Sequence, residues 1–194
     1  MKRVALTALF ALVVAPAPAP AQELGFDHGR VRYADAGVTL QRASETGAEE
    51  ATPNMPFFPG DRVWTDGGGR GEFQFKGGSV VRLDSRSKLD DLSHDREGSD
   101  ETIALRLWSG SLILHVTDGR GGPRFEIEAQ GGLLSVSDRG VYRVDADAGE
   151  TRVSVYEGQA VLDASRRRLT LEEGETAAAA EREHDDGLDE RPRR

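Results

Sequence analysis

Residue types that often carry catalysis are present in this chain, but their spacing does not build a recognised site. The four histidines are His28, His94, His115 and His184. No two of them stand four residues apart or at the intervals of zinc sites. Ser79, Ser109 and Ser111 lack the small-residue elbow of a serine hydrolase, and the glycines of residues 67–71 lack the lysine of a phosphate-binding loop. We therefore expect no catalytic, cofactor-binding or metal-binding residue, and no enzyme.

Carboxylates are abundant, with 34 aspartates and glutamates against 25 lysines and arginines. Seven lie within residues 84–101, but their order matches neither an EF-hand loop nor a calcium-binding glycine–aspartate repeat. We interpret residues 93–101 as an exposed acidic loop. The chain has no cysteine, which excludes disulfides and lipid attachment through an N-terminal cysteine.

Three aromatic residues are the strongest candidates for a binding surface. Trp108 and Tyr156 each precede a glycine by two residues. They alternate with the apolar Leu107 and Val155, so both are expected to face outward. Outward aromatic side chains anchor partners or stack on sugars, although they also cap neighbouring strands. We assign Trp108 and Tyr156, with Trp64 as a third member, to a partner-binding surface. Trp108 and Tyr156 should lie on one side if the repeats stack in register.

These aromatic residues belong to a sequence that repeats itself. A ladder of apolar residues and glycine at 105–114 recurs 48 residues later at 153–162, and a looser echo relates 73–89 to 125–142. Each unit reads as strand, glycine turn and strand, and it buries its apolar face only by stacking on neighbours. The sequence predicts an all-β fold, a twisted, solenoid-like stack of short strands. The residues predicted to lie inside are Leu105, Leu107, Leu112, Leu114, Val153, Val155 and Leu162.

The ends of the chain differ from this repetitive body. Residues 1–21 combine two basic residues, an 11-residue apolar run and a small-residue cleavage site, which is the pattern of a secretory signal peptide. Residues 22–28 read as a lead-in and residues 29–176 as the β domain. Residues 177–194 begin with helix-forming residues and become dominated by charge, so we expect a short helical or disordered tail.

The composition also limits the partners and the compartment. The formal net charge is −9, and −11 once the basic residues of the signal peptide are removed. A negative protein opposes nonspecific binding to nucleic acids and to anionic membranes. After residue 21 no apolar run is long enough to span a bilayer. We expect a soluble protein in the periplasm or outside the cell, with no integral membrane segment after processing.

Five short sequences follow one another in order along the chain: Gly-Asp-Arg-Val-Trp-Thr at 60–65, Gly-Gly-Ser-Val-Val-Arg-Leu at 77–83, Leu-Trp-Ser-Gly-Ser-Leu at 107–112, Val-Tyr-Glu-Gly-Gln-Ala-Val at 155–161 and Glu-Gly-Glu at 173–175. This ordered series resembles the FecR-like domain family. Each piece alone is common, whereas the series covers about residues 29–179. The resemblance implies a twisted, β-solenoid-like domain on the outer side of the inner membrane. In the best-known members this domain belongs to a regulator that passes an iron-transport signal to a sigma factor.

The chain departs from those regulators, because it lacks a cytoplasmic anti-sigma segment before a membrane helix. We expect a free-standing, exported FecR-like domain protein. The resemblance implies a noncatalytic interaction or sensory module of the bacterial cell envelope that recognises a protein partner. The alternative is a module that binds a carbohydrate or another envelope polymer, which export, the β scaffold and the outward aromatics favour.

Overall fold

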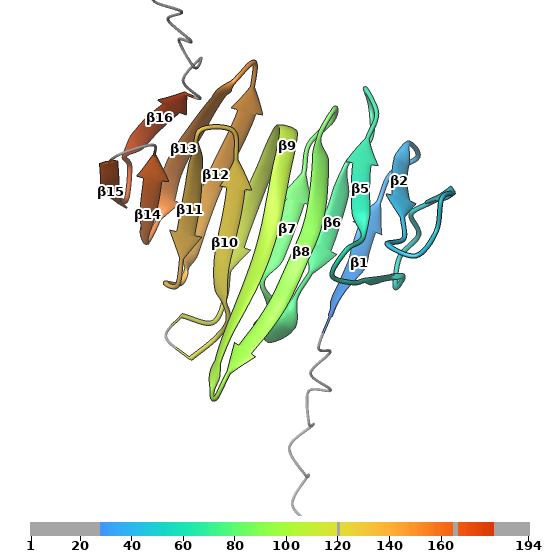
Figure 1. Ribbon diagram of the computed structural model, residues 1–194, viewed down its shortest axis with the longest axis horizontal. Coiled ribbons are helices and arrows are strands. Elements are labelled where there is room, and N and C mark those ends of the chain that lie inside the picture. The colour runs from blue at the N-terminus through green and yellow to red at the C-terminus, as the bar shows by residue number, and fades with distance from the viewer. Residues whose placement is uncertain (1–27, 120, 165–166, 181–194) are drawn as a thin grey trace, which may run out of the picture.

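The computed structural model describes residues 28–119, 121–164 and 167–180. Within these ranges the chain is almost entirely β-strand, apart from turns and one 3-10 helix, η1 (Lys76–Gly78). The strands stack along the long axis of the molecule, and the chain advances from β1 (Gly29–Ala34) near one end to β16 (Thr176–Ala180) near the other (Figure 1). The predicted all-β fold is confirmed, and the sheet is open.

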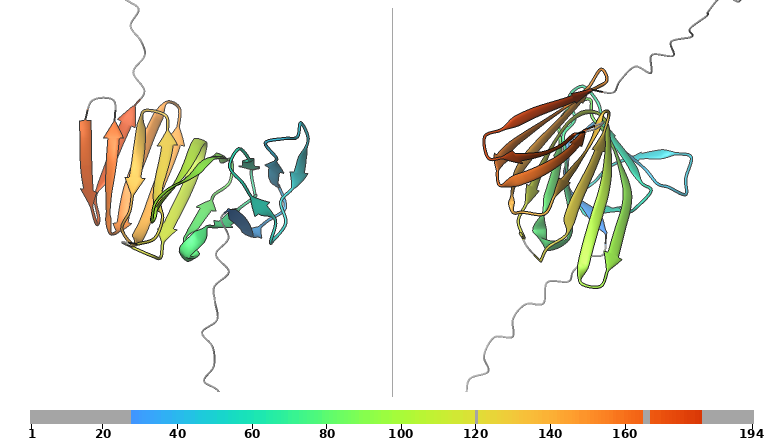
Figure 2. Two further views of the ribbon diagram at one scale, coloured as in Figure 1. Left: turned by 60° about the horizontal axis from the view of Figure 1, so that its bottom comes forward. Right: turned by 60° about the vertical axis from the view of Figure 1, so that its left-hand side comes forward.

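The strands form two layers that share one long strand, β9 (Asp100–Val116). The other strands of the first sheet are β1, β4 (Pro56–Phe57), β6 (Gly71–Gln74), β7 (Val80–Leu83), β12 (Gly140–Asp147), β13 (Glu150–Glu157) and β16. Those of the second sheet are β2 (Val38–Gln41), β3 (Ala48–Glu50), β5 (Arg62–Thr65), β8 (Lys88–Glu97), β10 (Arg124–Ala129), β11 (Gly132–Val136), β14 (Gln159–Ala164) and β15 (Arg167–Glu172). The two layers are visible in Figure 2.

The order of hydrogen-bonded strands along each sheet largely follows their order in the sequence. The first sheet has the order β4-β1-β6-β7-β9-β12-β13-β16. The second has the order β3-β2-β5-β8-β9-β10-β11-β14-β15. Pairs within the described ranges are antiparallel except β9 with β10, which run parallel because the chain makes one full coil between them. That coil is compatible with solenoid-like stacking.

Glycines sit where the chain crosses between the layers. Residues 100–109 of β9 pair within the second sheet, and residues 110–116 pair within the first. Gly110 lies at this corner with φ +86, a backbone conformation that favours glycine. A Cβ there would come within 2.6 Å of Ser87 Cα. Gly158, with φ +91, forms the corresponding corner between β13 and β14, where the chain returns from the first sheet to the second.

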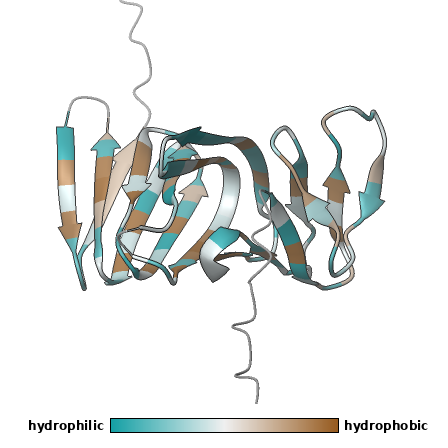
Figure 3. Cartoon of the chain, turned by 90° about the horizontal axis from the view of Figure 1, so that it is seen from below, coloured by the Kyte–Doolittle hydropathy of each residue, from teal (hydrophilic) through white to brown (hydrophobic). Residues whose placement is uncertain are grey.

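The core lies between the two layers and is apolar. All seven residues predicted to lie inside are at most 1% exposed, which confirms that prediction. Alternating hydrophobic and hydrophilic residues along the strands are visible in Figure 3. Towards the N-terminal half, the core contains a group of phenylalanine rings, with 4.9 Å between the ring centroids of Phe57 and Phe73 and 5.8 Å between those of Phe75 and Phe125.

Three segments differ from the predictions. Residues 93–101 are not a loop but the ends of β8 and β9, which pair as far as Glu97 with Asp100 and project beyond the other strands (Figure 1). The polar and acidic composition of residues 43–54 predicts a loop, but residues 48–50 within it form β3. Residues 177–180, expected to begin a helical tail, belong to β16, because pairing with β13 satisfies their backbone groups and overrides the local propensity of alanine.

The predicted signal peptide and residues 181–194 of the predicted tail lie outside the described residues. Within the described part of the chain, there is no helix with the length and apolar character needed to cross a membrane.

Candidate functional site

The three aromatic residues predicted to bind a partner lie on two different faces. Trp64 on β5 and Trp108 on β9 point outward from the second sheet, whereas Tyr156 on β13 points outward from the first. Trp108 is 39% exposed and Tyr156 is 54% exposed, and Trp64 is half-buried. The expectation that Trp108 and Tyr156 share one side is wrong, because the two glycine corners carry the chain between the layers in opposite directions.

A β-bulge sets the position of Trp108. Leu89 of β8 pairs with Leu107 of β9, and Lys88 pairs with Ser109, so Trp108 is the extra residue between them. A bulge bends its strand and changes the direction of a side chain. Trp108 therefore stands out from the face of the second sheet beside the strand that carries Lys88.

Charged side chains hold the Trp108 indole in place. Its Nε1 donates a hydrogen bond of 2.8 Å to Asp90 Oδ2. Arg62 Cζ, Lys88 Nζ and Arg106 Cζ lie 5.7, 5.3 and 5.3 Å from the ring centroid, within the range of cation–π attraction. The indole is thus oriented before any partner binds. We call Trp108 and these four charged residues the Trp108 cluster.

The cluster belongs to a row of alternating charges across four strands. Arg62, Asp90, Arg106 and Glu128 are consecutive partners in the register of β5, β8, β9 and β10. Arg62 donates two hydrogen bonds of 2.6 Å to Asp90, and Arg106 donates bonds of 2.9 and 2.5 Å to Glu128. Ion pairs at the surface contribute little to stability, but these two restrict the side chains that surround the indole.

Asp90 is ionised despite its partial burial. Burial opposes the charged form, but hydrogen bonds from Arg62 and Trp108 outweigh it and lower the pKa of the Asp90 carboxyl. The carboxylate can therefore accept from both donors at neutral pH. Sequence reasoning missed Asp90, Arg62 and Arg106 as site residues. Alternation along each strand could have placed them outward, but their meeting depends on register between strands far apart in the sequence.

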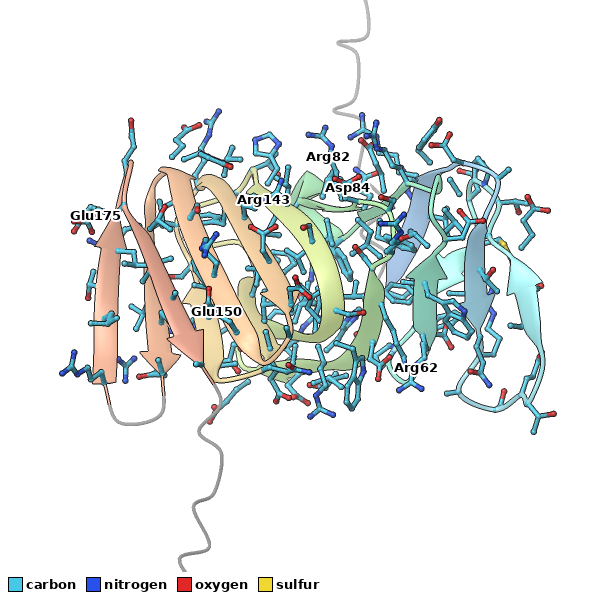
Figure 4. All side chains as sticks on the ribbon, turned by 90° about the horizontal axis from the view of Figure 1, so that it is seen from above. Arg62, Arg82, Asp84, Arg143, Glu150 and Glu175 are labelled. Carbon is cyan, nitrogen blue, oxygen red and sulfur yellow. The ribbon has the colours of Figure 1, made fainter. Side chains whose placement is uncertain are left out.

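Tyr156 has separate surroundings on the first sheet. It lies at a register shift between β12 and β13, as Trp108 does between β8 and β9. Nearby, the Arg143 guanidinium is 2.7 Å from Asp145. Figure 4 shows Arg143 and Arg82 towards one side of the molecule and Arg62 towards the other. The aromatic prediction therefore describes two surfaces.

A buried ionisable pair lies elsewhere, at the base of the projecting β8–β9 hairpin. Asp91 is 1% exposed and His94 Nε2 lies 3.0 Å from its Oδ2. The His94 ring packs edge-on against Phe75 with 5.8 Å between centroids. Burial raises the pKa of the Asp91 carboxyl, and the contact with His94 only partly opposes this. Asp61, the other buried carboxylate nearby, is held by Arg42 at 2.9 Å.

Residues 61–161 match the model of the FecR protein family. The chain belongs to the FecR family. The matched segment runs from β5 into β14 and contains both glycine corners, Trp64, Trp108 and Tyr156. The resemblance found in the sequence is therefore confirmed. Membership of this family supports a sensory or regulatory module of the bacterial envelope.

Two crystal structures of a candidate anti-sigma factor from Parabacteroides distasonis are similar to this FecR family member. Each has a TM-score of 0.48, with sequence identities of 16% and 17%. In both, 62% of this chain aligns with 59% of the crystallised chain, so the chain spans less than two thirds of these relatives. No curated protein sequence matches the chain.

Proposed function

We propose that this FecR family member is an exported, noncatalytic interaction or sensory module of the cell envelope. It recognises a protein partner through the outer face of its second sheet. The carrying observation is the Trp108 cluster, in which an indole exposed to 39% is fixed by one hydrogen bond and three nearby cations. The FecR family membership supports an envelope module, and the signal peptide pattern of residues 1–21 supports export.

The geometry of the Trp108 cluster suits a protein interface. Tryptophan and arginine are the residues most enriched among those that dominate binding energy. A side chain that is already ordered loses little conformational freedom on binding, so more of the contact energy appears as affinity. The row of alternating charges beside the indole would orient the partner, because rim charges favour matching partners over others.

The predicted residues then have different roles. Trp108 is the proposed anchor, and Trp64 lies on the same face. Between them is Lys88 of β8, which pairs with Trp64 of β5 and with Ser109 of β9, the neighbour of Trp108. A role for Tyr156 would belong to a separate contact on the first sheet. We keep residues 29–176 as the proposed interaction domain, preceded by a lead-in at 22–28.

Site-directed photo-crosslinking in cells tests which face meets a protein. One variant carries a photoreactive amino acid in place of Thr39, beside Trp64 on the second sheet, and another in place of Ser154 on the first sheet. We expect a discrete protein adduct from position 39 and none from position 154. An adduct from position 154 alone, or none from either, would reject docking on the second sheet.

A second candidate function is recognition of an envelope carbohydrate. It is favoured by a groove that adjoins the Trp108 cluster and shares Arg62 and Lys88 with it. The groove is lined by Trp64 and by Arg86 and Lys88, which have no carboxylate partner among the described residues. Carbohydrate recognition there has its own test.

A further inference from the structure

A groove lies on the outer face of the second sheet, at the end of β5 and β8. Its volume is about 540 Å³, which falls within the usual range for small-molecule sites. Its lining residues are Gln41, Arg62, Trp64, Thr65, Arg86, Ser87, Lys88 and Ser109. Trp108 is not among them, but Arg62 and Lys88 also belong to the Trp108 cluster, so the groove adjoins the proposed protein anchor.

Three of the lining side chains are available to a ligand. Among the residues that the structure describes, neither the exposed Arg86 nor Lys88 is paired with a carboxylate, and Trp64 Nε1 donates no hydrogen bond, although Lys88 Nζ also lies 5.3 Å from the centroid of the Trp108 ring. Arg62, in contrast, is held by Asp90 at 2.6 Å. Thr65 Oγ1 donates to the carbonyl of Asp84 at 2.6 Å, so its hydroxyl is used within the fold.

The backbone beneath the groove is closed to an added strand. β2 pairs with β3 and β5, and β5 pairs with β2 and β8, so both strands have neighbours on each side. A peptide that binds by strand addition needs a free edge. Recognition here must come from side chains, namely an indole face, a guanidinium, an ammonium and the polar groups of Gln41 and Ser109.

These groups fit a ligand with flat apolar faces, hydroxyls and carboxylates. We propose that the groove binds a short acidic oligosaccharide, with one sugar ring stacked on Trp64 and carboxylates held by Arg86 and Lys88. The local positive charge is complementary to such a ligand although the whole chain carries −9. Arginine and lysine form strong, charge-assisted hydrogen bonds with carboxylates.

Neighbouring charges limit the length of the ligand. A second hollow of about 720 Å³ shares Arg86 and Ser109 with the groove and continues past the Gly110 corner. Its other charged lining residues are Asp145, Asp147, Glu150 and Arg152, of which Glu150 and Arg152 pair at 3.1 Å. Carboxylates outnumber cations among these four residues, so they would oppose a polyanion that extends beyond Arg86. A trisaccharide should therefore bind as tightly as a longer chain.

Tryptophan fluorescence can report binding at this groove alone. The chain contains two tryptophans, so in the full chain carrying Trp108→Phe the remaining indole is Trp64. The probes are trigalacturonate, its neutral trimethyl ester, hexagalacturonate and the acidic peptide triglutamate. We expect saturable quenching with trigalacturonate, similar affinity for hexagalacturonate, and at least about tenfold weaker binding of the trimethyl ester.

Substitutions locate the site. Arg86→Gln and Lys88→Gln should each weaken trigalacturonate binding about tenfold, with melting temperatures near that of the parent. Tyr156→Ala, on the opposite sheet, should leave binding unchanged. Equal binding of the trimethyl ester, equal or tighter binding of triglutamate, or no quenching by any probe at about 10 mM would each overturn the proposal. None of these results depends on whether a protein docks at Trp108.

Discussion

At the scale of single residues, Asp90 decides whether Trp108 is a fixed anchor or a mobile side chain. It accepts hydrogen bonds from both the indole and the Arg62 guanidinium. Asp90→Ala removes both bonds, so the ring should gain freedom. In a Trp64→Phe background, the fluorescence anisotropy of Trp108 should fall, and partner affinity should drop about tenfold.

Asp163→Ala is the matched control for Asp90→Ala. Asp163 lies on the same outer face and pairs with Arg168 at 3.8 Å, far along the sheet from Trp108. Its loss should leave the anisotropy unchanged. If Asp90→Ala and Asp163→Ala behave alike, the hydrogen bond to Asp90 does not orient the indole.

The buried Asp91 should make the folded protein less stable as the pH rises, whereas an ordinary ion-paired carboxylate has the opposite effect. Burial raises the pKa of its carboxyl above the ordinary value of 3.8, so the folded protein keeps this proton to higher pH than the unfolded chain. The contribution is complete below pH 3.8 and is lost as pH rises through the folded-state pKa. In urea unfolding from about pH 4 to 7, the wild-type free energy of unfolding should fall relative to that of Asp91→Asn. The opposite slope would mean that His94 outweighs burial.

Sequence alternation predicts orientation at this scale but not partnership. It placed Trp108 and Tyr156 outward, and both are exposed. It could not show that Asp90 meets Trp108, because 18 residues separate them and a bulge brings them together. The sequence also does not predict that Asp91 is buried at an inward position of β8, because an acidic segment is expected to be exposed to solvent.

At the scale of strands and turns, the glycine corners fix the layer to which each strand belongs. Gly110 combines φ +86 with close contact to Ser87. Gly110→Ala should therefore lower the free energy of unfolding by about 2–5 kcal/mol, from backbone strain and overpacking together. Chemical denaturation of the two proteins measures the difference.

Gly98→Ala separates the two causes. Gly98, in the hairpin turn, has φ +63 but no atom within 4 Å of an added Cβ. Its substitution should cost only the backbone strain, about 1–2 kcal/mol. A Gly110→Ala protein no less stable than Gly98→Ala would show that the corner can relax.

The repeat spacing predicts these corners because their positive φ favours glycine, so glycine marks them in the sequence. The ends of strands depend instead on hydrogen bonding to partner strands that are distant in the sequence. Residues 93–101 look like a loop from their charge, yet each strand of the hairpin supplies the other's hydrogen bonds. Residues 177–180 look helical from their alanines, yet β13 offers an unpaired edge that they complete. Local composition contains neither of these partners.

At the scale of the whole molecule, one apolar core joins the two layers. Leu107 is 1% exposed at the centre of the shared strand β9, so Leu107→Ala should lower the free energy of unfolding by about 2–5 kcal/mol. Urea denaturation followed by circular dichroism checks this. A loss below about 0.5 kcal/mol would contradict a well-packed centre.

The 48-residue repeat predicts which residues lie in the core, but it does not predict on which of the two sheets each outward-facing residue lies. Inward residues stay inward whichever layer they join, so Leu107 and Val155 are both buried. Outward residues depend on the layer, and the repeat exchanges layers at each glycine corner. This exchange separates Trp108 from Tyr156 and leaves the proposed protein contact on the second sheet.

The proposed docking of a protein on the second sheet is tested most directly with the partner identified by photo-crosslinking, by measuring its affinity for two variants. Trp108→Ala and Tyr156→Ala remove similarly exposed aromatic rings from opposite sheets. Calorimetric titration should show at least about tenfold weaker binding for Trp108→Ala and no change for Tyr156→Ala, with both melting temperatures near that of the wild type. Unchanged binding by Trp108→Ala, or a loss confined to Tyr156→Ala, would contradict docking on the second sheet.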